Sequence, residues 1–241
     1  MPYFYRMKIL VTAATTLEIK PFLQYLEQHS QQVSDHRFRL AGCEVDVLIA
    51  GIGMMHTAFS LGKYFTLHTP HVAIQAGICG TFRKDWHLGA VVAVEREHLA
   101  DLGAEDNDQF KDLFDINLWQ QSQHPFTGAS LVNTFRAWPL AQELPTASGI
   151  SVNRVSGSAP TIAQLEAKYK PDTESMEGAA FHYACLQENI PFLQIRSISN
   201  YVEIRDKSKW QIPTAVKNLN DELVRTVEQL CSHYASVIKN F

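Results

Sequence analysis

Five polar residues of this chain stand beside strands or helices that the sequence predicts, where their side chains could do chemistry together. Glu18 lies in the first turn of a predicted helix, and Glu177 lies near the start of a later one. Ser197, Ser199 and Asn200 directly follow a run of apolar residues. Two carboxylates and an amide could activate a water molecule, stabilise a growing positive charge and recognise a polar ring. Taken singly, the same side chains could equally cap helices and turns.

Whether these residues meet depends on the elements around them. Apolar runs predict strands, at residues 8–14, 72–76, 88–94, 129–132, 148–152 and 190–195, and a hairpin at 37–50. Helical spacing predicts helices, at residues 16–28, 160–168, 175–187 and 217–239, with another opened by a glycine loop at 51–60. Residues 99–142 are polar and predict mainly loops. The alternation indicates one domain over residues 1–241, a three-layer α/β/α sandwich with a central mixed sheet.

Composition excludes several classes of protein. The 241 residues carry a net charge of -4, which gives no basic footprint for nucleic acid. The apolar runs are too short to cross a membrane, and no signal peptide is recognisable, so we expect a cytoplasmic protein. The four cysteines are widely spaced, which indicates reduced thiols, and no histidine pair has metal-ligand spacing. We therefore expect no metal.

The glycine loop weakly suggests a dinucleotide site. Gly51 and Gly53 follow a strand and open a helix, but His56 stands where the third glycine of a dinucleotide fingerprint belongs. No acidic residue follows at the place where the ribose would need one. A phosphate-binding loop is also excluded, because no Gly-Lys-Ser/Thr sequence occurs.

Five segments in order carry a resemblance to a known family. They are Glu18, the loop at 51–53, the segments 77–80 and 175–177, and the segment 197–200. Over about residues 8–227 the chain resembles the purine nucleoside phosphorylase and nucleosidase superfamily. Within it, the segments around Glu177 and Asn200 are most similar to the futalosine hydrolase branch, which acts in an alternative menaquinone pathway. The resemblance implies the α/β/α fold, a nucleoside substrate, and assembly as a homodimer or a higher homo-oligomer.

The resemblance implies roles for the two carboxylates. Glu18 matches the residue that activates water in the nucleosidases, where a weak nucleophile attacks an oxocarbenium-like sugar. Glu177 matches the glutamate that accepts hydrogen bonds from the ribose 2′- and 3′-hydroxyls. Met176 would lie flat under the sugar, although a methionine of the core is an equally consistent interpretation.

The resemblance also implies residues that contact the base. Ile78, in the segment at 77–80, is expected to touch the substrate. The base-stacking segment aligns with Asn153, Arg154 and Val155, and here Arg154 or Val155 stands in place of an aromatic or aliphatic neighbour. Asn153 could also be an ordinary residue of a strand edge.

Asn200 is the predicted selector of the base, with Ser199 beside it. In adenine-specific members of the superfamily an aspartate stands here, whereas members acting on 6-oxopurines use an asparagine, whose amide can donate to N7 and O6. An aspartate facing a 6-oxo oxygen would set acceptor against acceptor. Ser197 and Ser199 are expected to support a turn after the strand.

Water rather than phosphate is the expected acceptor. Phosphorylases of the superfamily hold the anion with arginines, and one of those places is taken here by Gln75 and Ala76. Arg83 is six residues beyond Gly77 and is interpreted as a surface charge. A crevice without cationic donors would hold a dianion poorly.

These observations, with the resemblance, predict a purine nucleosidase that splits futalosine into hypoxanthine and dehypoxanthinyl futalosine and uses no cofactor. Three alternatives stay open. One is a nucleosidase for methylthioadenosine and S-adenosylhomocysteine, which calls for an acid at Asn200. Another is a nucleoside-binding module without catalysis. The presence of both Glu18 and Glu177 argues against this alternative, because binding alone would not need the pair. A dinucleotide enzyme is the third.

Overall fold

The computed structural model describes residues 6–107, 109–135 and 144–238. The strands are β1 (Lys8–Ala13), β2 (Gln31–Ser34), β3 (Arg37–Leu40), β4 (Cys43–Ile49), β5 (Val72–Thr81), β6 (Val91–Leu99), β7 (Gly103–Asp106), β8 (Gln109–Asp112), β9 (Leu131–Val132), β10 (Thr146–Ser151), β11 (Thr173–Ser175) and β12 (Phe192–Tyr201). The α-helices are α1 (Thr16–His29), α2 (Met54–Leu67), α3 (Ala159–Tyr169), α4 (Gly178–Gln187) and α5 (Ile212–Ile238), with a 3₁₀ turn, η2, at Lys207–Lys209.

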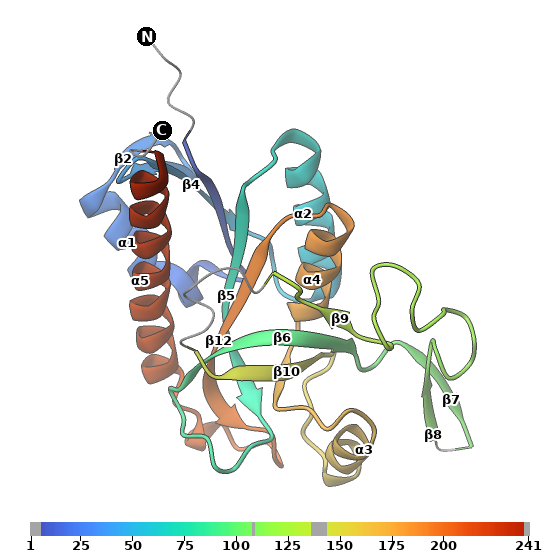
Figure 1. The fold of residues 1–241 in the computed structure, drawn as a ribbon. Coiled ribbons are helices and arrows are strands. Elements are labelled where there is room, and N and C mark those ends of the chain that lie inside the picture. Colours follow the sequence, from blue (N-terminus) through green and yellow to red (C-terminus); the bar gives the residue numbers. More distant parts are fainter. Residues whose placement is uncertain (1–5, 108, 136–143, 239–241) are drawn as a thin grey trace.

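The strands form one large mixed sheet and a separate small hairpin. The order in the large sheet is β11-β10-β6-β12-β5-β1-β4-β3-β2, with β9 beside β6, and β7 pairs only with β8. Strands β1, β4, β5 and β12 are parallel, whereas β6 runs antiparallel to β12. Strand β11 pairs with both β10 and β5, so the strands from β5 round to β11 close into a ring (Figure 1).

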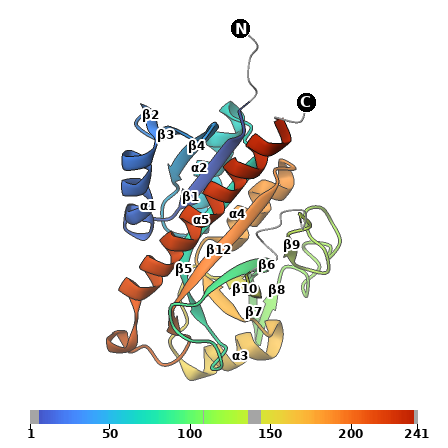
Figure 2. The same ribbon diagram turned by 60° about the vertical axis from the view of Figure 1, so that its left-hand side comes forward.

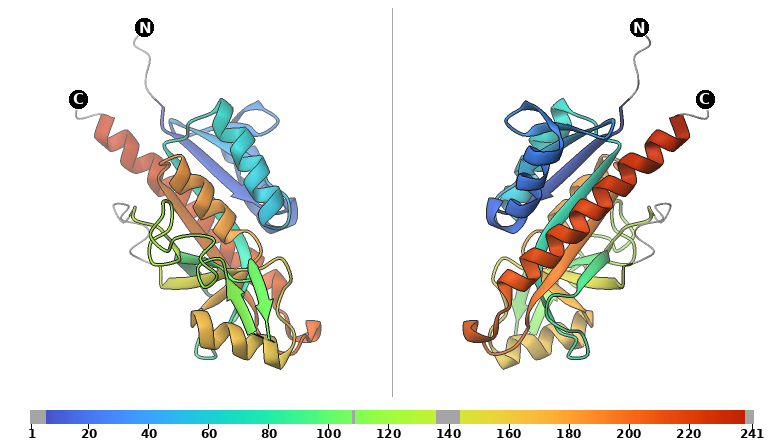
Figure 3. Two further views of the ribbon diagram at one scale, coloured as in Figure 1. Left: turned by 90° about the vertical axis from the view of Figure 1, so that its right-hand side faces the viewer. Right: turned by 90° about the vertical axis from the view of Figure 1, so that its left-hand side faces the viewer.

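Helices cover both faces of the sheet. Helices α1 and α5 pack against each other on one side, and α2 and α4 pack together on the other (Figures 2 and 3). The expected three-layer α/β/α sandwich is therefore confirmed. Within the described residues, none of the helices is both long enough and apolar enough to traverse a bilayer.

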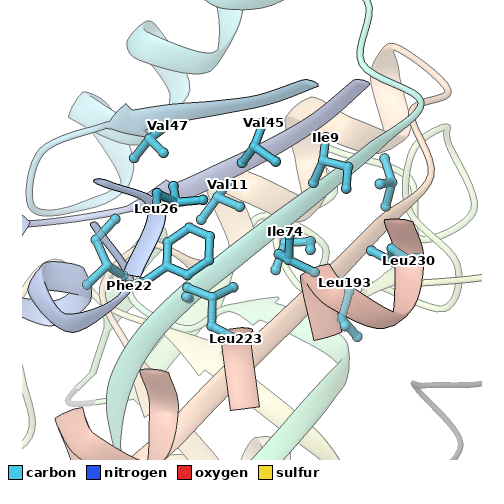
Figure 4. Packing of buried hydrophobic residues seen from close by; sticks show 14 of the residues in the cluster. Ile9, Val11, Phe22, Leu26, Val45, Val47, Ile74, Leu193, Leu223 and Leu230 are labelled. Atoms are coloured by element: carbon cyan, nitrogen blue, oxygen red, sulfur yellow. The ribbon is translucent and has the colours of Figure 1, made fainter. Parts of the chain in front are cut away.

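The largest core fills the space between the sheet and helices α1 and α5. Val11 of β1 and Ile74 of β5 meet Phe22 of α1 and Leu223 of α5, all fully buried (Figure 4). A second cluster on the opposite face joins Leu10 to α2 and α4. Because both faces are covered, β1, β5 and β12 each contain a run of mainly apolar residues, which made them recognisable in the sequence.

Several boundaries differ from the sequence-based expectations. Strand β5 continues through residues 77–80, and β12 continues through residues 197–201, so neither segment is a turn after a strand. Helix α4 begins at Gly178, because Ser175 ends β11. Helix α5 begins earlier than expected, and residues 99–142 contain the hairpin β7–β8 as well as loops. Polar residues extend these strands because their side chains find partners across the sheet, which no local pattern reveals.

Candidate active site

Glu18 joins the first helix to the carboxyl end of the sheet. Thr15 is the N-cap of α1, and its backbone N–H and its hydroxyl both donate to Glu18 Oε2 at 3.0 Å. The other oxygen, Oε1, accepts from the N–H of Ile78 on β5 at 3.2 Å. The helix-capping interpretation is therefore correct for Oε2 of Glu18. Its Oε1 instead binds the backbone of β5 near the carboxyl end of that strand.

Asn220 of α5 fixes the backbone around Glu18. Helix α1 is kinked at Ile19, and the side chain of Asn220 fits where the bond from Phe22 N–H to the Glu18 carbonyl would be. Its Oδ1 accepts from Phe22 N–H at 3.0 Å, and its Nδ2 donates to the Glu18 carbonyl at 2.8 Å. Asn220 is 2% exposed, so both backbone groups are satisfied in the interior by one amide.

Glu177 is the second carboxylate of the site. It lies immediately before α4 and is 6% exposed. Its Oε1 accepts from the N–H of Gly53 at 3.0 Å, which ties the glycine loop to the start of α4. Gly53 has a φ of +89°, a conformation that residues with a side chain rarely adopt.

A buried arginine connects these carboxylates. Arg196 of β12 is 2% exposed and donates from Nη1 to Glu177 Oε2 at 3.3 Å. Its Nη2 donates to Gln75 and its Nε donates to Gln194, each at 2.9 Å. A side chain on Gly77 of β5 would lie 2.3 Å from Arg196 Nη1 and 3.2 Å from Glu18 Oε1, so both charged groups lie over this glycine.

Arg196 corrects one expectation from the sequence. The crevice was expected to contain no cation, yet a guanidinium lies in it. The guanidinium of Arg196 donates hydrogen bonds to Glu177, Gln75 and Gln194. It therefore positions these side chains. Arg83 was predicted to be a surface charge, and its half-exposed side chain does pair with Asp85 and Asp172.

Burial changes the acidity of Glu18. Loss of solvent raises its pKa above the ordinary 4.5, opposed by the charge of Arg196 and the hydrogen bond from Ile78. The charge of Glu177 raises this pKa further. A carboxylate whose pKa moves toward neutrality is a better general base than a free one, because it binds the proton from water more tightly.

A buried polar network that the sequence reading missed lies behind Arg196. Gln194 accepts from Arg196 and donates to Glu97 Oε1 and to His182 Nε2, both at 3.0 Å. Ser151 donates to Glu97 Oε2 at 3.0 Å. Burial raises the pKa of Glu97 to about 7 and lowers that of His182 to about 3. The available signal was that Glu97 and Arg196 continue strands that begin as mainly apolar runs, since buried charges need partners.

Asn200 lies within β12 beside an irregularity in the sheet. Ile198 pairs with Cys79 and Asn200 pairs with Gly80, so Ser199 is an extra residue on β12. Such a bulge re-aims the following side chain. The Ser199 hydroxyl lies 3.0 Å from the Cys79 carbonyl and 2.8 Å from Asn200 Oδ1, and Asn200 Nδ2 donates to the Tyr201 carbonyl at 3.0 Å. One proton of the Asn200 amide is left for a ligand.

A cavity opens beside Asn200. It is lined by residues of β5, β11 and β12, of the segment between β10 and α3, and of the segment after β12, among them Gly80, Val155, Ser156, Glu174, Asn200 and Trp210. Gly80 is two residues beyond Ile78 on β5, so the cavity begins about 7 Å along the strand from the Glu18 contact.

The predicted site residues divide into two groups. Glu18, Ile78 and Glu177 surround Arg196, and half-buried Met176 directly precedes Glu177. Val155 and Asn200 line the cavity, with Ser199 beside them. Arg154 and Asn153 are exposed and do not line the cavity, and Asn153 binds Asp101 instead. Ser197 contacts the Gly89 carbonyl, away from Asn200, and supports no turn there.

Comparisons with known proteins give the family. The model of the Phosphorylase superfamily matches residues 8–235, and the chain belongs to this family. The futalosine hydrolase of Streptomyces coelicolor is 29% identical over 188 residues, which cover 73% of this chain and 75% of the relative.

A relative with a different substrate is almost equally similar. The 5′-methylthioadenosine/S-adenosylhomocysteine nucleosidase of Maridesulfovibrio salexigens is 28% identical, with 81% of this chain and 87% of the relative covered. The crystal structure of such a nucleosidase from Colwellia psychrerythraea, in complex with adenine, superposes with a TM-score of 0.77 at 20% identity. It covers 95% of this chain and 97% of that chain. The protein is a hydrolase of N-glycosyl bonds in nucleosides.

Proposed function

We propose that the protein hydrolyses the N-ribosidic bond of futalosine, releasing hypoxanthine and dehypoxanthinyl futalosine. The observation that carries the proposal is the amide of Asn200 in the wall of the cavity, which begins two residues along β5 from the contact between Ile78 and Glu18. A free amide proton suits the O6 or N7 acceptor of a 6-oxopurine, whereas an aspartate would suit the amino group of adenine. The similarity to futalosine hydrolases supports the same substrate, and the step would then belong to menaquinone biosynthesis.

Glu18 acts as the base that activates water. Its Oε1 faces the carboxyl end of β5, and its raised pKa favours accepting a proton during attack on the anomeric carbon. Glu177 accepts hydrogen bonds from the ribose hydroxyls and stabilises the positive charge that grows on the sugar. Gly53 and Arg196 hold Glu177 in place.

Water is the acceptor in this mechanism. A phosphate dianion at the sugar would lie close to Glu18 and Glu177, and the guanidinium of Arg196 already binds Glu177 and two glutamines. The anion would meet repulsion without a free cationic donor. Adding phosphate should therefore neither accelerate base release nor give a ribose 1-phosphate product.

Substrate choice is tested by assaying base release from futalosine and from its 6-amino analogue. We expect a higher kcat/KM for futalosine in the wild type, and a shift of relative preference toward the 6-amino analogue in Asn200→Asp. A mismatch of one buried hydrogen bond corresponds to about ten- to a hundred-fold. A wild type that prefers the 6-amino analogue would contradict the proposal.

The second candidate is cleavage of 5′-methylthioadenosine or S-adenosylhomocysteine. It is favoured by the 28% identity to a nucleosidase of that specificity over most of both chains. Both compounds belong in the same assay. Faster adenine release from them than hypoxanthine release from futalosine would establish this second function instead.

A second copy of the chain is the proposed partner. Ile52, Met55 and Phe59 form an apolar surface at the glycine loop and the first turns of α2, with exposed fractions of 56%, 73% and 73%. Residues 55 and 59 are one helical turn apart and share a face. The surface adjoins Gly53, which binds Glu177, so an apposed copy would cover the substrate-binding end of the molecule.

A further inference from the structure

A third acidic residue, Glu174, lies opposite Asn200 across the cavity. Glu174 is the middle residue of β11 and pairs with Gly80 of β5, while Asn200 of β12 pairs with Gly80 from the other side. Directly paired residues of neighbouring strands project to the same face of a sheet. The carboxylate and the amide therefore flank Gly80 on one face.

Gly80 keeps the space between them open. A Cβ on this residue would lie 2.9 Å from Val202 Cγ2 and 3.1 Å from Asn200 Nδ2. Glu174, Gly80 and Asn200 all line the cavity. Glu174 offers a hydrogen-bond acceptor on one side of this space and Asn200 a donor on the other, while Gly80 between them has no side chain. A space of this shape suits the edge of a planar ring.

The surroundings of Glu174 do not account for a buried acid. The residue is 3% exposed, and its carboxylate accepts from the N–H of Ser156 at 3.0 Å and from the Ser156 hydroxyl. The ion pairs among the described residues do not include Glu174. Burial raises its pKa, and the two bonds from Ser156 only partly oppose this. Burying a carboxyl group is costly, and two donors leave acceptor sites on its oxygens unused.

We propose that Glu174 is a second specificity-determining residue, which accepts a hydrogen bond from the protonated N1 of a 6-oxopurine while Asn200 donates to the O6 and N7 side. This inference rests on the proposed function. A 6-oxopurine carries a proton on N1, whereas N1 of a 6-aminopurine is an acceptor. The carboxylate of Glu174 therefore attracts the first base and repels the second. Asn200 and Glu174 select the same class of base from two sides of one ring.

Glu174→Gln tests the proposal. The new amide keeps an oxygen for Ser156 and gains a donor that can bond to the unprotonated N1 of a 6-aminopurine. We expect the ratio of kcat/KM for futalosine to kcat/KM for its 6-amino analogue to fall about ten-fold or more. Exposed Glu166 on α3 supplies the matched control, Glu166→Gln, which should leave the ratio unchanged.

The outcomes separate this inference from the proposed function. Equal losses on both substrates would mean that Glu174 only holds Ser156, and would overturn the inference while the function stands. Failure of the wild type to cleave futalosine would overturn both. A third measurement needs no variant: the wild type should discriminate at least ten-fold against futalosine methylated at N1. Equal use of this methylated nucleoside would also overturn the inference.

Discussion

At the scale of single residues, the site depends on buried charges that hold one another. Arg196 donates to Glu177, to Gln75 and to Gln194, so one guanidinium positions three side chains from three parts of the chain. One carboxylate oxygen of Glu18 caps α1, and the other accepts a hydrogen bond from Ile78 near the carboxyl end of β5. These two residues make different contributions: Arg196 positions its neighbours, and Glu18 is the proposed base.

Glu18→Gln should lower kcat about 10²-fold or more with a smaller change in KM, because an amide cannot take the proton from water. Steady-state kinetics of base release measure the effect. The control is Glu27→Gln, at an exposed position of the same helix, which should behave like the wild type. Turnover of Glu18→Gln at the wild-type rate would remove Glu18 from the mechanism.

Glu97 should make stability depend on pH. Its pKa in the folded state is about 7, against an ordinary 4.5, because the carboxyl group is buried. Between these values only the folded state holds the proton, so the free energy of unfolding falls as pH rises from about 4.5 to about 7. At about 1.4 kcal/mol per pH unit the total is roughly 3 kcal/mol.

Chemical denaturation of the wild type and Glu97→Gln across this pH range measures the effect. The glutamine can bond to Gln194 and Ser151 but does not titrate, so the variant should gain stability relative to the wild type as pH rises. His182, whose pKa is lowered to about 3, is present in both proteins and contributes the opposite slope to each. A difference in unfolding free energy that stays constant with pH would contradict the raised pKa of Glu97.

At the scale of elements, two irregularities place the functional groups. The extra residue Ser199 in β12 directs Asn200 into the cavity. The kink of α1 at Ile19 breaks the regular helix directly after Glu18, and Asn220 of α5 replaces the missing backbone bond. Without the extra residue in β12 the side chain of Asn200 would project to the other face of the sheet, and without the kink in α1 the backbone after Glu18 would follow a regular helix.

Asn220→Leu should therefore reduce both stability and activity. It leaves Phe22 N–H and the Glu18 carbonyl buried without partners, at about 1–3 kcal/mol each, so we expect a loss of roughly 2–6 kcal/mol in unfolding free energy. Movement of Glu18 should also lower kcat, by about ten-fold. Denaturation curves and kinetics measure both, and Lys217→Leu on the exposed side of α5 is the control. An unchanged unfolding free energy and kcat in Asn220→Leu would show that the backbone of α1 does not need the two hydrogen bonds from Asn220.

At the scale of the whole molecule, the sandwich buries its strands on both faces and leaves apolar residues exposed beside the site. Ile52, Met55 and Phe59 are large apolar side chains with more than half of their surface in water. Exposure of such a cluster is unfavourable unless another surface covers it. This favours self-association with the site near the interface.

Phe59→Asp should lower the molar mass of the protein in solution, because a charge would be buried in the proposed contact. Light scattering after size-exclusion chromatography measures the mass. Leu118→Asp is the matched control, since Leu118 is 70% exposed and lies far along the chain. A wild type that is already monomeric, or an oligomer that survives Phe59→Asp, would contradict the proposed interface.

Local patterns in the sequence were sufficient for much of the fold. Apolar runs and helical spacing predicted β1, α1, the hairpin β3–β4 and the layered architecture, because both faces of the sheet are covered and the burial pattern repeats along each element. The resemblance carried by the segments around Glu18, Glu177 and Asn200 also implied a nucleosidase. Apolar runs and helical spacing depend on neighbours within a few residues along the chain, so they can be recognised in the sequence alone.

The tertiary structure decided which distant residues meet. Arg196, Gln194 and Glu97 belong to β12 and β6, and their contacts depend on strand order in the sheet. Glu174 and Asn200 face each other only because β11 and β12 both pair with Gly80, and a shift of one residue in either strand would turn its side chain to the other face. Register between strands is set by packing over the whole sheet, so no local stretch of sequence contains it.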